Sequence, residues 1–549
     1  MAIKYITDMS RCVPSSSLST RSKRNHWRRV EYVSEQLSGT MLLAGAVTEA
    51  PDITCPLDVK GWHAISIGYW LPTHEQRVEI KVRLTSDPCF VVMADNEPDG
   101  MTAVTVREAF WKYEDLTGEQ IILGQQTKGT SRPACVAYIK LQPLCDSQVE
   151  AIQTKRADKS TRTITVTNDG GSFMTTKAPT TAEEICEQIE PYRYSDVGRI
   201  DWAICYGDMT NYPSKVGWNY FEERYCDDYP NEGDRRIMQS LRALADQGLV
   251  LHELAMKHAR EMGLEFHAMI RLGIGNYPPP FDAGGGLMAD RPEMRLVARD
   301  GTPLPKISYA FPEVRRRMLD IIEEILDDEI DGINLCWMRG APCVAFEKPV
   351  ADAFRDRYGD ELDGVSDDDE RLWRVWADII TDFMREVRKL TNRVGQRRKR
   401  PVKVTTMVGG TTFSCALSRG HDIRQWIEEK LIDDIIAAAI NSPYYHDKGI
   451  RQHLYIGPDG PDAYRAGVKM ALETGAPASL IFDVNGVQEL QNHWVILREL
   501  GHREQIIDGK SELPQPMRCK MTSIGGIDVT HTAPWGGVAG EALVMYTNG

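Results

Sequence analysis

The sequence predicts an α/β protein: a (β/α)8 TIM barrel with an N-terminal β-sandwich and a small C-terminal β element. Three patterns predict it. Residues 1–150 contain short alternating segments separated by turn residues, residues 162–505 alternate between short apolar runs and amphipathic helical segments, and residues 510–549 return to a β-like pattern. The length of 549 residues suits roughly two to four domains.

The first part of the chain is typical of antiparallel strands. Residues 76–84 alternate cleanly, which places their valine, isoleucine and leucine side chains on one face. Residues 61–70 and 135–141 are rich in β-branched and aromatic residues, and turns of Pro, Gly, Asp and Asn separate such segments. We therefore predict a sandwich domain over residues 1–150, followed by a polar linker at 146–161.

The segment 312–337 illustrates the barrel pattern. Residues 312–326 are predicted as a helix because apolar side chains recur at helical spacing and Pro312 suits a first turn. The apolar run 333–337 follows directly and is typical of a buried parallel strand. In barrels, the residues at the carboxyl ends of such strands form the functional site. Trp337 and Arg339, at the end of this strand, are therefore candidate site residues.

Eight such units are expected over about 340 residues, which is the count of a TIM barrel with long loops. An open doubly wound sheet is disfavoured because no Gly-x-Gly-x-x-Gly fingerprint follows the first strand. The sixth connection, 441–453, is short and polar and shows no clear helix. The predicted strands span residues 164–167, 202–206, 266–270, 333–337, 402–407, 435–440, 454–456 and 479–482. The predicted helices span residues 182–189, 235–262 (broken near Gly248), 312–326, 369–390, 423–431, 461–472 and 487–500.

Composition narrows the class of protein. The net charge of −14 disfavours nucleic acid as a partner. No run of about 18 apolar residues exists, and the N-terminus lacks the apolar core of a secretory signal, so neither a membrane span nor secretion is predicted. The twelve cysteines form no Cys-x-x-Cys pair, which favours reduced thiols in a cytoplasmic protein. Homo-oligomer formation stays open.

Polar residues just past the predicted strands should converge on one mouth of the barrel. Carboxylates, guanidinium groups, amides and aromatic rings together are typical of carbohydrate recognition. Sugar hydroxyls both donate and accept hydrogen bonds, and sugar faces stack on aromatic rings. The candidates are Asn168, Asp169, Asp208, His267, Arg271, Trp337, Arg339, Glu347, Tyr445 and Asp483.

Each candidate also has a purely structural interpretation. Asn168 and Asp169 fit a tight turn before two glycines, and Asp208 fits a turn cap. Glu347 precedes a predicted helix start and would complement its dipole. His267 fits a satisfied core histidine, and the aromatic candidates fit core packing. The two arginines follow apolar runs without an obvious local partner, which favours a clamp on a ligand.

Other chemistries lack their signatures. The chain contains no Gly-x-Ser-x-Gly elbow of a serine hydrolase and no phosphate-binding loop. It contains neither His-x-His nor His-Glu-x-x-His, so a hydrolytic metal centre lacks its usual ligands. Cys336 is interpreted as a buried strand residue rather than a nucleophile. No metal and no cofactor are predicted.

Several motifs carry a family resemblance. Ala255-x-x-His258-Ala259-Arg260-Glu261, which leads into the strand ending at residue 270, is one, and Phe311-Pro312-Glu313 and Asp331-Gly332-Ile333-Asn334-Leu335 follow. Residues 423–427 and 441–443 match more loosely. On these motifs, residues 160–500 resemble the family-10-like glycoside hydrolases, bacterial TIM-barrel proteins with an attached β-sandwich domain. The resemblance implies action on a saccharide. Many relatives carry an acidic residue about where Cys336 stands, and here the next carboxylate is Glu347.

We therefore predict a metal-independent glycoside hydrolase that acts on an oligosaccharide or glycoside. In such enzymes a protonated carboxyl gives its proton to the leaving oxygen while a second carboxylate attacks or activates water. Asp208 and Glu347 are the predicted pair, with Glu347 as acid/base, because they follow the second and fourth strands. Asp169 and Asp483 are the reserves.

Two alternatives remain. A catalytically inactive carbohydrate-binding barrel is favoured by Cys336 at the end of the fourth strand. A lyase or isomerase acting on an anionic sugar would use Arg271 and Arg339 as the anion clamp and His267 as the base.

Overall fold

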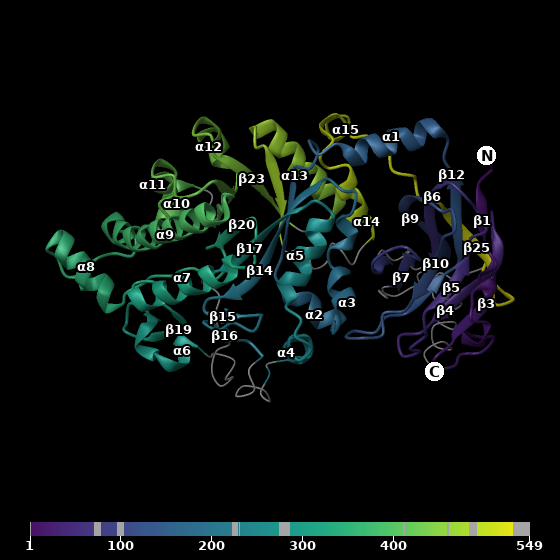
Figure 1. The fold of residues 1–549 in the computed structure, drawn as a ribbon, viewed down its shortest axis with the longest axis horizontal. Coiled ribbons are helices and arrows are strands. Elements are labelled where there is room, and N and C mark those ends of the chain that lie inside the picture. The colour runs from purple at the N-terminus through teal and green to yellow at the C-terminus, as the bar shows by residue number, and fades with distance from the viewer. Residues whose placement is uncertain are drawn as a thin grey trace. The chain divides into compact units, whose positions relative to one another are not determined.

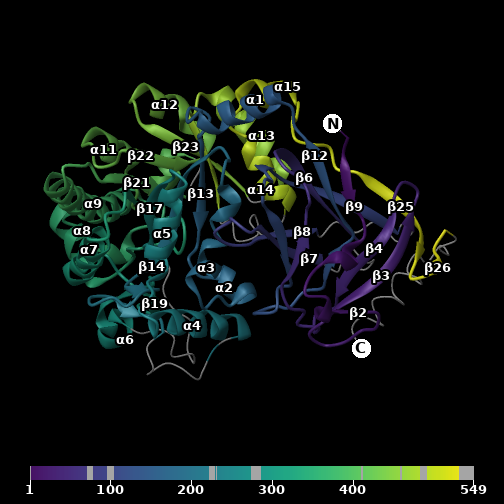
Figure 2. The same cartoon turned by 45° about the vertical axis from the view of Figure 1, so that its right-hand side comes forward.

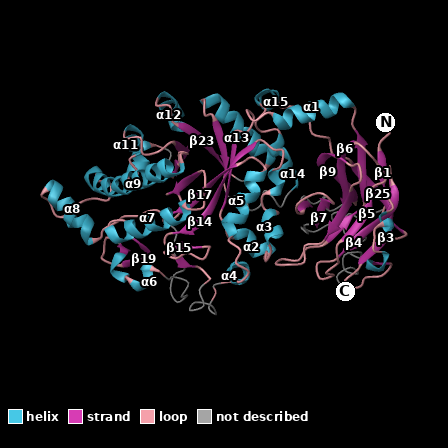
Figure 3. Cartoon of the chain, viewed as in Figure 1, coloured by secondary structure: helices cyan, strands magenta, loops and turns pink. Residues whose placement is uncertain are grey.

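The computed structural model describes residues 2–70, 78–95, 104–221, 229, 231–273, 286–409, 412–457, 460–482 and 491–530. The chain divides into two compact units. Unit 1 comprises Met1–Thr161, Thr176–Asp196 and Asn485–Gly549, and unit 2 comprises Arg162–Thr175 and Val197–Val484. Strands dominate unit 1, whereas strands and helices alternate along unit 2 (Figure 3).

Unit 2 is a closed barrel of eight parallel strands (Figure 1). The ring closes because the first strand pairs on one side with the second and on the other with the eighth. The predicted TIM barrel is thereby confirmed, and each predicted strand overlaps an observed one. In chain order the strands are β13 (Ile164–Asn168), β14 (Val197–Tyr206), β17 (Glu265–Arg271), β20 (Gly332–Cys336), β21 (Lys403–Met407), β22 (Asp434–Ala437), β23 (Arg451–Ile456) and β24 (Ala478–Ile481). Short strands add to the loops: β15 (Met209–Thr210), β16 (Trp218–Asn219), β18 (Arg295–Val297) and β19 (Pro303–Ile307).

Helices pack around the outside of the barrel (Figure 2). The apolar stripe predicted for α7 is the buried one, since Val314, Met318, Ile321, Ile322 and Ile325 all lie in the core. The helices between the strands are α2 (Ser172–Lys177), α4 (Glu232–Ala245), α5 (Leu251–Glu261), α6 (Leu287–Asp290), α7 (Pro312–Leu326), α8 (Lys348–Tyr358), α9 (Glu370–Arg398), α10 (Phe413–Leu417), α11 (Ile423–Glu428), α12 (Ser442–Asp447) and α13 (Pro461–Thr474).

The sixth connection differs from its prediction. The strand expected over residues 435–440 ends at Ala437, and a 3-10 turn, Ala439–Asn441, leads into the short helix α12. Pro443 lies in the first turn of α12, where its missing N–H removes no helical hydrogen bond. A proline there starts the helix early, so the polar segment that showed no helical periodicity still forms one turn and a half.

Unit 1 contains the two sheets of the predicted sandwich. They are antiparallel throughout the described pairings except where β2 meets β3. The large sheet has the order β1 (Lys4–Ile6), β12 (Tyr138–Pro143), β6 (Trp62–Trp70), β9 (Thr105–Asp115), β25 (Arg518–Ile524), β3 (Trp27–Ser34), β4 (Ser38–Ala44) and β11 (Ala134–Val136), with β2 (Leu18–Ser19) beside β3 and β26 (Ile527–Asp528) beside β25. The second sheet has the order β5 (Ile53–Pro56), β10 (Gln120–Gly124), β7 (Val78–Leu84) and β8 (Val91–Asp95). The helices are α1 (Asp146–Ala157), α3 (Ala182–Cys186), α14 (Gln491–Val495) and α15 (Arg503–Asp508).

The ends of the chain are organised differently from the division 1–150, 162–505 and 510–549. Strand β25 lies between β9 and β3, so the C-terminal segment is an inner strand of the large sheet. Helix α14, expected to follow the last barrel strand on the barrel, belongs to unit 1, where the Trp494 indole donates to the Val92 carbonyl at 3.3 Å. Pairing between residues hundreds of positions apart decided this, and local pattern does not report it. The strand expected at 542–546 lies outside the described residues.

Two further properties of the described part of the chain concern its cysteines and its helices. The eleven cysteines described there are all free. Among the described helices, none is both long and apolar enough to cross a membrane.

Candidate functional site

The loop after β13 is a helix entry. Asp169 accepts hydrogen bonds from the backbone N–H groups of Gly171 (3.0 Å) and Ser172 (2.8 Å), and so caps α2. The Asn168 side chain accepts from Gly170 at 2.8 Å, and Gly170 has a φ of +69°, which favours glycine. Both polar residues are buried at the end of their strand. The turn interpretation of this motif therefore describes what these side chains do in the structure.

Asp208 is buried in the loop after β14. Its Oδ2 atom accepts from the Leu287 N–H at 2.8 Å, which ties this loop to α6. Burial raises the pKa of Asp208, while the Leu287 N–H and the Arg317 charge oppose that shift. Gly286, with a φ of +65°, passes so close that an added Cβ would lie 2.4 Å from Oδ2. The carboxyl is thus desolvated and held by backbone.

Glu347 is buried in the loop after β20, at the N-terminus of α8. Its two oxygens are held separately: Oε1 accepts from the Val297 N–H and Oε2 from the Ala345 N–H, each at 3.0 Å. Burial raises the pKa of Glu347 against these two hydrogen bonds, which favour the carboxylate. A carboxyl in this setting is oriented, and its proton affinity is increased.

The two arginines differ in exposure. Arg271, at the end of β17, is buried, and its guanidinium carbon lies 5.8 Å from the ring centroid of Tyr206. Arg339 is exposed in the loop after β20. Asp483 lies outside the described residues. Of the two guanidinium groups, Arg271 is held against the barrel wall and Arg339 reaches solvent.

The aromatic candidates face the core. Trp337 is fully buried, with Tyr309 at 5.6 Å, His421 at 5.5 Å and Trp426 at 6.3 Å between ring centroids. Tyr445 is also buried and packs against Phe413. A ring without an exposed face gives a saccharide nothing to stack on. In this structure the packing interpretation accounts for both rings, because Trp337 at the end of β20 and Tyr445 in α12 are each buried against other aromatic rings.

The barrel axis at the carboxyl ends of the strands is apolar. Cys336 stands in this layer, with its Sγ 3.6 Å from the Met407 sulfur, and burial raises the pKa of its thiol. Tyr206 and Met338 pack against the layer from the rim. The Arg271 charge and the backbone N–H groups of Met338 and Arg339 oppose this shift in the pKa of Cys336, and burial outweighs them. The buried members are Ala203, Met269, Cys336, Met407, Ile436, Leu480 and Phe482.

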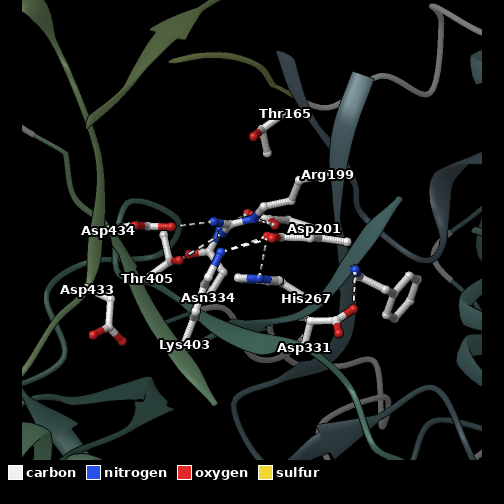
Figure 4. A network of polar contacts seen from close by, with 12 residues as sticks. Thr165, Arg199, Asp201, His267, Asp331, Asn334, Lys403, Thr405, Asp433 and Asp434 are labelled. Atoms are coloured by element: carbon white, nitrogen blue, oxygen red, sulfur yellow. Dashed lines mark hydrogen bonds and ion pairs between the residues drawn. The ribbon is translucent and has the colours of Figure 1, made fainter. Parts of the chain in front are cut away.

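The amino-terminal halves of the strands enclose a buried ion network instead (Figure 4). Arg199 bonds Asp201 through two nitrogens, at 2.5 and 2.9 Å, and Asn334 donates to Asp201 at 2.6 Å. His267 lies beside this network in β17, fully buried, and burial lowers its pKa. His267 therefore lies in the half of the barrel away from the mouth, and the structure does not bring it together with the residues that follow the strands.

A cavity of about 530 Å³ opens between the segments that follow β20 and β21. Its aromatic wall consists of Phe346, Trp373 and Trp376, where Phe346 meets Trp376 edge-on at 5.8 Å. The indole of Trp373 donates to the Asp367 carbonyl and that of Trp376 to the Ala345 carbonyl, both at 2.7 Å, so both rings are held. Carboxylates and hydroxyls complete the lining: Asp367, Asp368, Thr412, Ser414 and Ser418, with Cys415.

None of these cavity residues is among the candidates predicted from the sequence. A usable signal was present, since Trp373 and Trp376 stand one helical turn apart directly after the acidic run 367–370. Helical periodicity alone does not distinguish these rings from core positions, because both lie within the predicted helix 369–390. The cavity that both rings line is formed by residues distant in sequence, which come from the segments after β20 and β21.

Inside unit 2, the described residues gather no group of three histidine, cysteine or carboxylate ligands.

Comparison with known proteins gives no family. No family model matches the chain, and no curated protein matches it.

Among solved structures, similarity is low. A family 36 α-galactosidase from Geobacillus stearothermophilus in complex with stachyose has 10% identity over 85% of this chain and 64% of that one, with a TM-score of 0.34. A family 18 N-acetylglucosaminidase from Paenibacillus barengoltzii has 9% identity over 62% and 99%, with a TM-score of 0.32. A family 26 β-(1,4)-mannanase from Podospora anserina has 10% identity over 88% and 95%, with a TM-score of 0.27. The chain thus spans less than two thirds of the α-galactosidase, and scores this low identify neither family nor activity.

Proposed function

We propose that the barrel binds a saccharide beside the carboxyl ends of β20 and β21 and hydrolyses a glycosidic bond there. One observation carries the proposal: the cavity of about 530 Å³ lined by Phe346, Trp373 and Trp376 together with Asp367 and Asp368. Ligand pockets fall between about 300 and 1,000 Å³, and this lining offers ring faces for sugar carbons with acceptors for hydroxyls. The resemblance of residues 160–500 to family-10-like glycoside hydrolases points the same way.

In this proposal Glu347 is the acid/base. It follows Phe346, a wall residue of the cavity, and burial raises its pKa, which is what a carboxyl needs to keep a proton near neutral pH. Asp208 is the second carboxyl; burial raises its pKa, and the Leu287 N–H and the Arg317 charge oppose that shift in favour of the carboxylate. The proton goes to the leaving oxygen while the other carboxylate attacks the sugar or activates water. Arg271 and Arg339 are proposed to hold the ligand.

The test is turnover of aryl glycosides and polysaccharides by the full chain, run with and without chelator. The proposal expects hydrolysis that chelator leaves unchanged and that Trp373→Ala weakens. Tyr5→Ala, which removes a half-buried ring of unit 1 that lines neither cavity, is the control and should leave turnover unchanged. Turnover abolished by chelator would contradict the metal-independent mechanism, and turnover insensitive to Trp373→Ala would contradict the cavity.

A second candidate function is favoured by one observation. Cys336 occupies the end of β20 within a layer of apolar side chains, where many of the family-10-like hydrolases that the chain resembles carry an acid. A barrel that binds a saccharide without cleaving it fits that layer. Saturable binding of an oligosaccharide, weakened by Trp373→Ala and accompanied by no product from any substrate of the panel, would select this candidate over the hydrolase.

A further inference from the structure

A second cavity, of about 480 Å³, lies within unit 1. Its walls come from three places: the turn that enters β6, the end of β12 and one side of α1. The side chains that give it its chemistry are Lys60, Trp62, His63, Asp146, Glu150 and Gln153. The barrel mechanism uses none of them.

The helical wall is a polar face that no other described element covers. Asp146, Glu150 and Gln153 recur at helical spacing and therefore share one side of α1. The helix buries no residue along its whole length. A surface helix normally turns an apolar stripe toward a core. This one presents two carboxylates, an amide and the Val149 side chain to the cavity.

Trp62 supplies an aromatic wall that is already fixed. The guanidinium of Arg156 lies 5.3 Å from its ring centroid, and the same guanidinium donates to the Tyr113 carbonyl at 2.6 Å. Trp62 itself is half-buried and lines the cavity. A ring held from one side loses little freedom when a ligand stacks on it, which favours binding.

His63 supplies a directed acceptor. It is only 6% exposed, and its Nδ1 lies 2.8 Å from the Gly61 carbonyl, so Nδ1 carries the hydrogen and Nε2 is the acceptor. No described residue hydrogen-bonds Nε2, and the ring lines the cavity. Gly61, with a φ of +82° and open space where a Cβ would lie, leaves the entrance beside it clear. The Nε2 atom can therefore accept a hydrogen bond from a ligand or from water in the cavity.

We propose that this cavity is a saccharide-binding site of the N-terminal sandwich, separate from the barrel. The carboxylates and His63 accept, Lys60 donates and Gln153 does both, which matches hydroxyl groups that donate and accept. The carboxylates of Asp146 and Glu150 are balanced by Lys60 in the lining and by Arg156 beside Trp62. The four charges sum to zero, which favours neither an anionic nor a cationic ligand. A neutral sugar with one ring face toward Trp62 satisfies all of these groups.

The test uses calorimetric titration of the full chain with cellohexaose, xylohexaose, mannohexaose and chitohexaose. It is run in the Trp373→Ala background, so that binding at the barrel cavity is weakened. We expect one of the four sugars still to bind, roughly 10-fold or more weakly after Trp62→Ala, since such a loss is usual for a central aromatic contact. Glu150→Gln, on an exposed helix face where folding is not at risk, should weaken binding about 3- to 10-fold.

Glu35→Gln, the same change at an exposed position away from the cavity, should leave binding unchanged. The proposal is overturned if none of the four sugars binds the Trp373→Ala chain at millimolar concentration. It is equally overturned if Trp62→Ala and Glu150→Gln both leave that binding intact in a folded protein. Because turnover is measured in a separate experiment, the binding result for the unit 1 cavity can be interpreted even if the barrel hydrolyses none of the substrates.

Discussion

Arg199 and Asp434 form an ion pair of 3.0 Å between strands β14 and β22, which stand on opposite sides of the eight-stranded ring. Arg199 also bonds Asp201 and Thr405, so one guanidinium joins three strands. Burial would raise the pKa of Asp434, but the hydrogen bond from His453 and the charge of Arg199 outweigh it, and the net shift is downward. The barrel interior is therefore held together at one end by charge and at the other by apolar packing.

Arg199→Met should destabilise the protein by about 3 to 5 kcal/mol, because it leaves Asp201 and Asp434 buried without their cation. Arg385→Met is the matched control. Arg385 pairs with Glu429 and Asp382 on the surface, at 43% side-chain exposure, and should cost less than about 1 kcal/mol. Urea unfolding measures both. A loss from Arg199→Met no larger than that of the control would mean that the network contributes little.

His421 should make stability depend on pH. It is fully buried against Trp337 and Trp426, and burial together with the Arg419 charge lowers its pKa to about 3. Below its ordinary pKa of 6.5 the unfolded chain takes up a proton that the folded chain refuses, so stability falls as pH drops from 6.5 toward 3. The slope from this residue is about 1.4 kcal/mol per pH unit near pH 5.

His421→Phe removes this contribution, since both ring nitrogens lack partners in the described structure and none is lost. The measurement is the free energy of unfolding at pH 7, 6 and 5, compared between parent and variant. Leu417→Val, a buried change without a titrating group, should shift stability by the same amount at each pH. A parent and a His421→Phe variant with equal slopes would show that the imidazole does not resist protonation.

Trp373→Ala should weaken saccharide binding at the barrel cavity by about 2 kcal/mol, roughly 30-fold in Kd, the scale of an aromatic hot spot. Trp373→Phe retains a ring and should recover part of the loss. The Kd for the best oligosaccharide, measured calorimetrically, reports both. Tyr5→Ala, at a half-buried ring that lines neither cavity, serves as the control in unit 1. Equal affinity in parent and Trp373→Ala would remove the cavity from the proposed function.

Substitutions of Asp208 and Glu347 should both lower kcat but should differ in their effect on stability. In Asp208→Asn the amide oxygen can still accept from Leu287, so folding should persist while kcat falls roughly 10²-fold or more, the scale of acid/base catalysis. In Glu347→Gln an NH2 group must face a backbone N–H, because both oxygens accept, and this should also cost about 1 to 3 kcal/mol of stability. Glu386→Gln, exposed on α9, is the neutral control.

A kcat close to that of the parent in both folded variants would contradict the assignment of Asp208 and Glu347 as the catalytic carboxyls. Asp169 and Asp483 would then be the next acids to test. For a working pair, the carboxyls should be separated by about 5 to 5.5 Å in a retaining enzyme or about 6.5 to 9.5 Å in an inverting one. A structure with a bound saccharide would supply that distance.

Local periodicity was sufficient to predict the barrel. The stripe of α7 and the buried run of β20 follow from side-chain spacing alone, because a helix and a buried strand each need their apolar residues at fixed intervals. The candidate site was predicted less completely. Position after a strand located Asp208, Glu347 and Arg271, but which way each side chain turns depends on neighbours that local sequence does not name.

The sequence by itself determined the alternation of strands and helices, the sandwich in the first 150 residues and the polar segments that follow each barrel strand. Tertiary structure alone decided that β25 joins β3 and β9, that Trp337 faces the core and that Trp373 and Trp376 wall a cavity. The physical reason is the separation along the sequence of the residues that interact. Backbone periodicity is set by residues a few positions apart, whereas burial, ion pairing and cavities depend on contacts between segments that only the closed fold brings together.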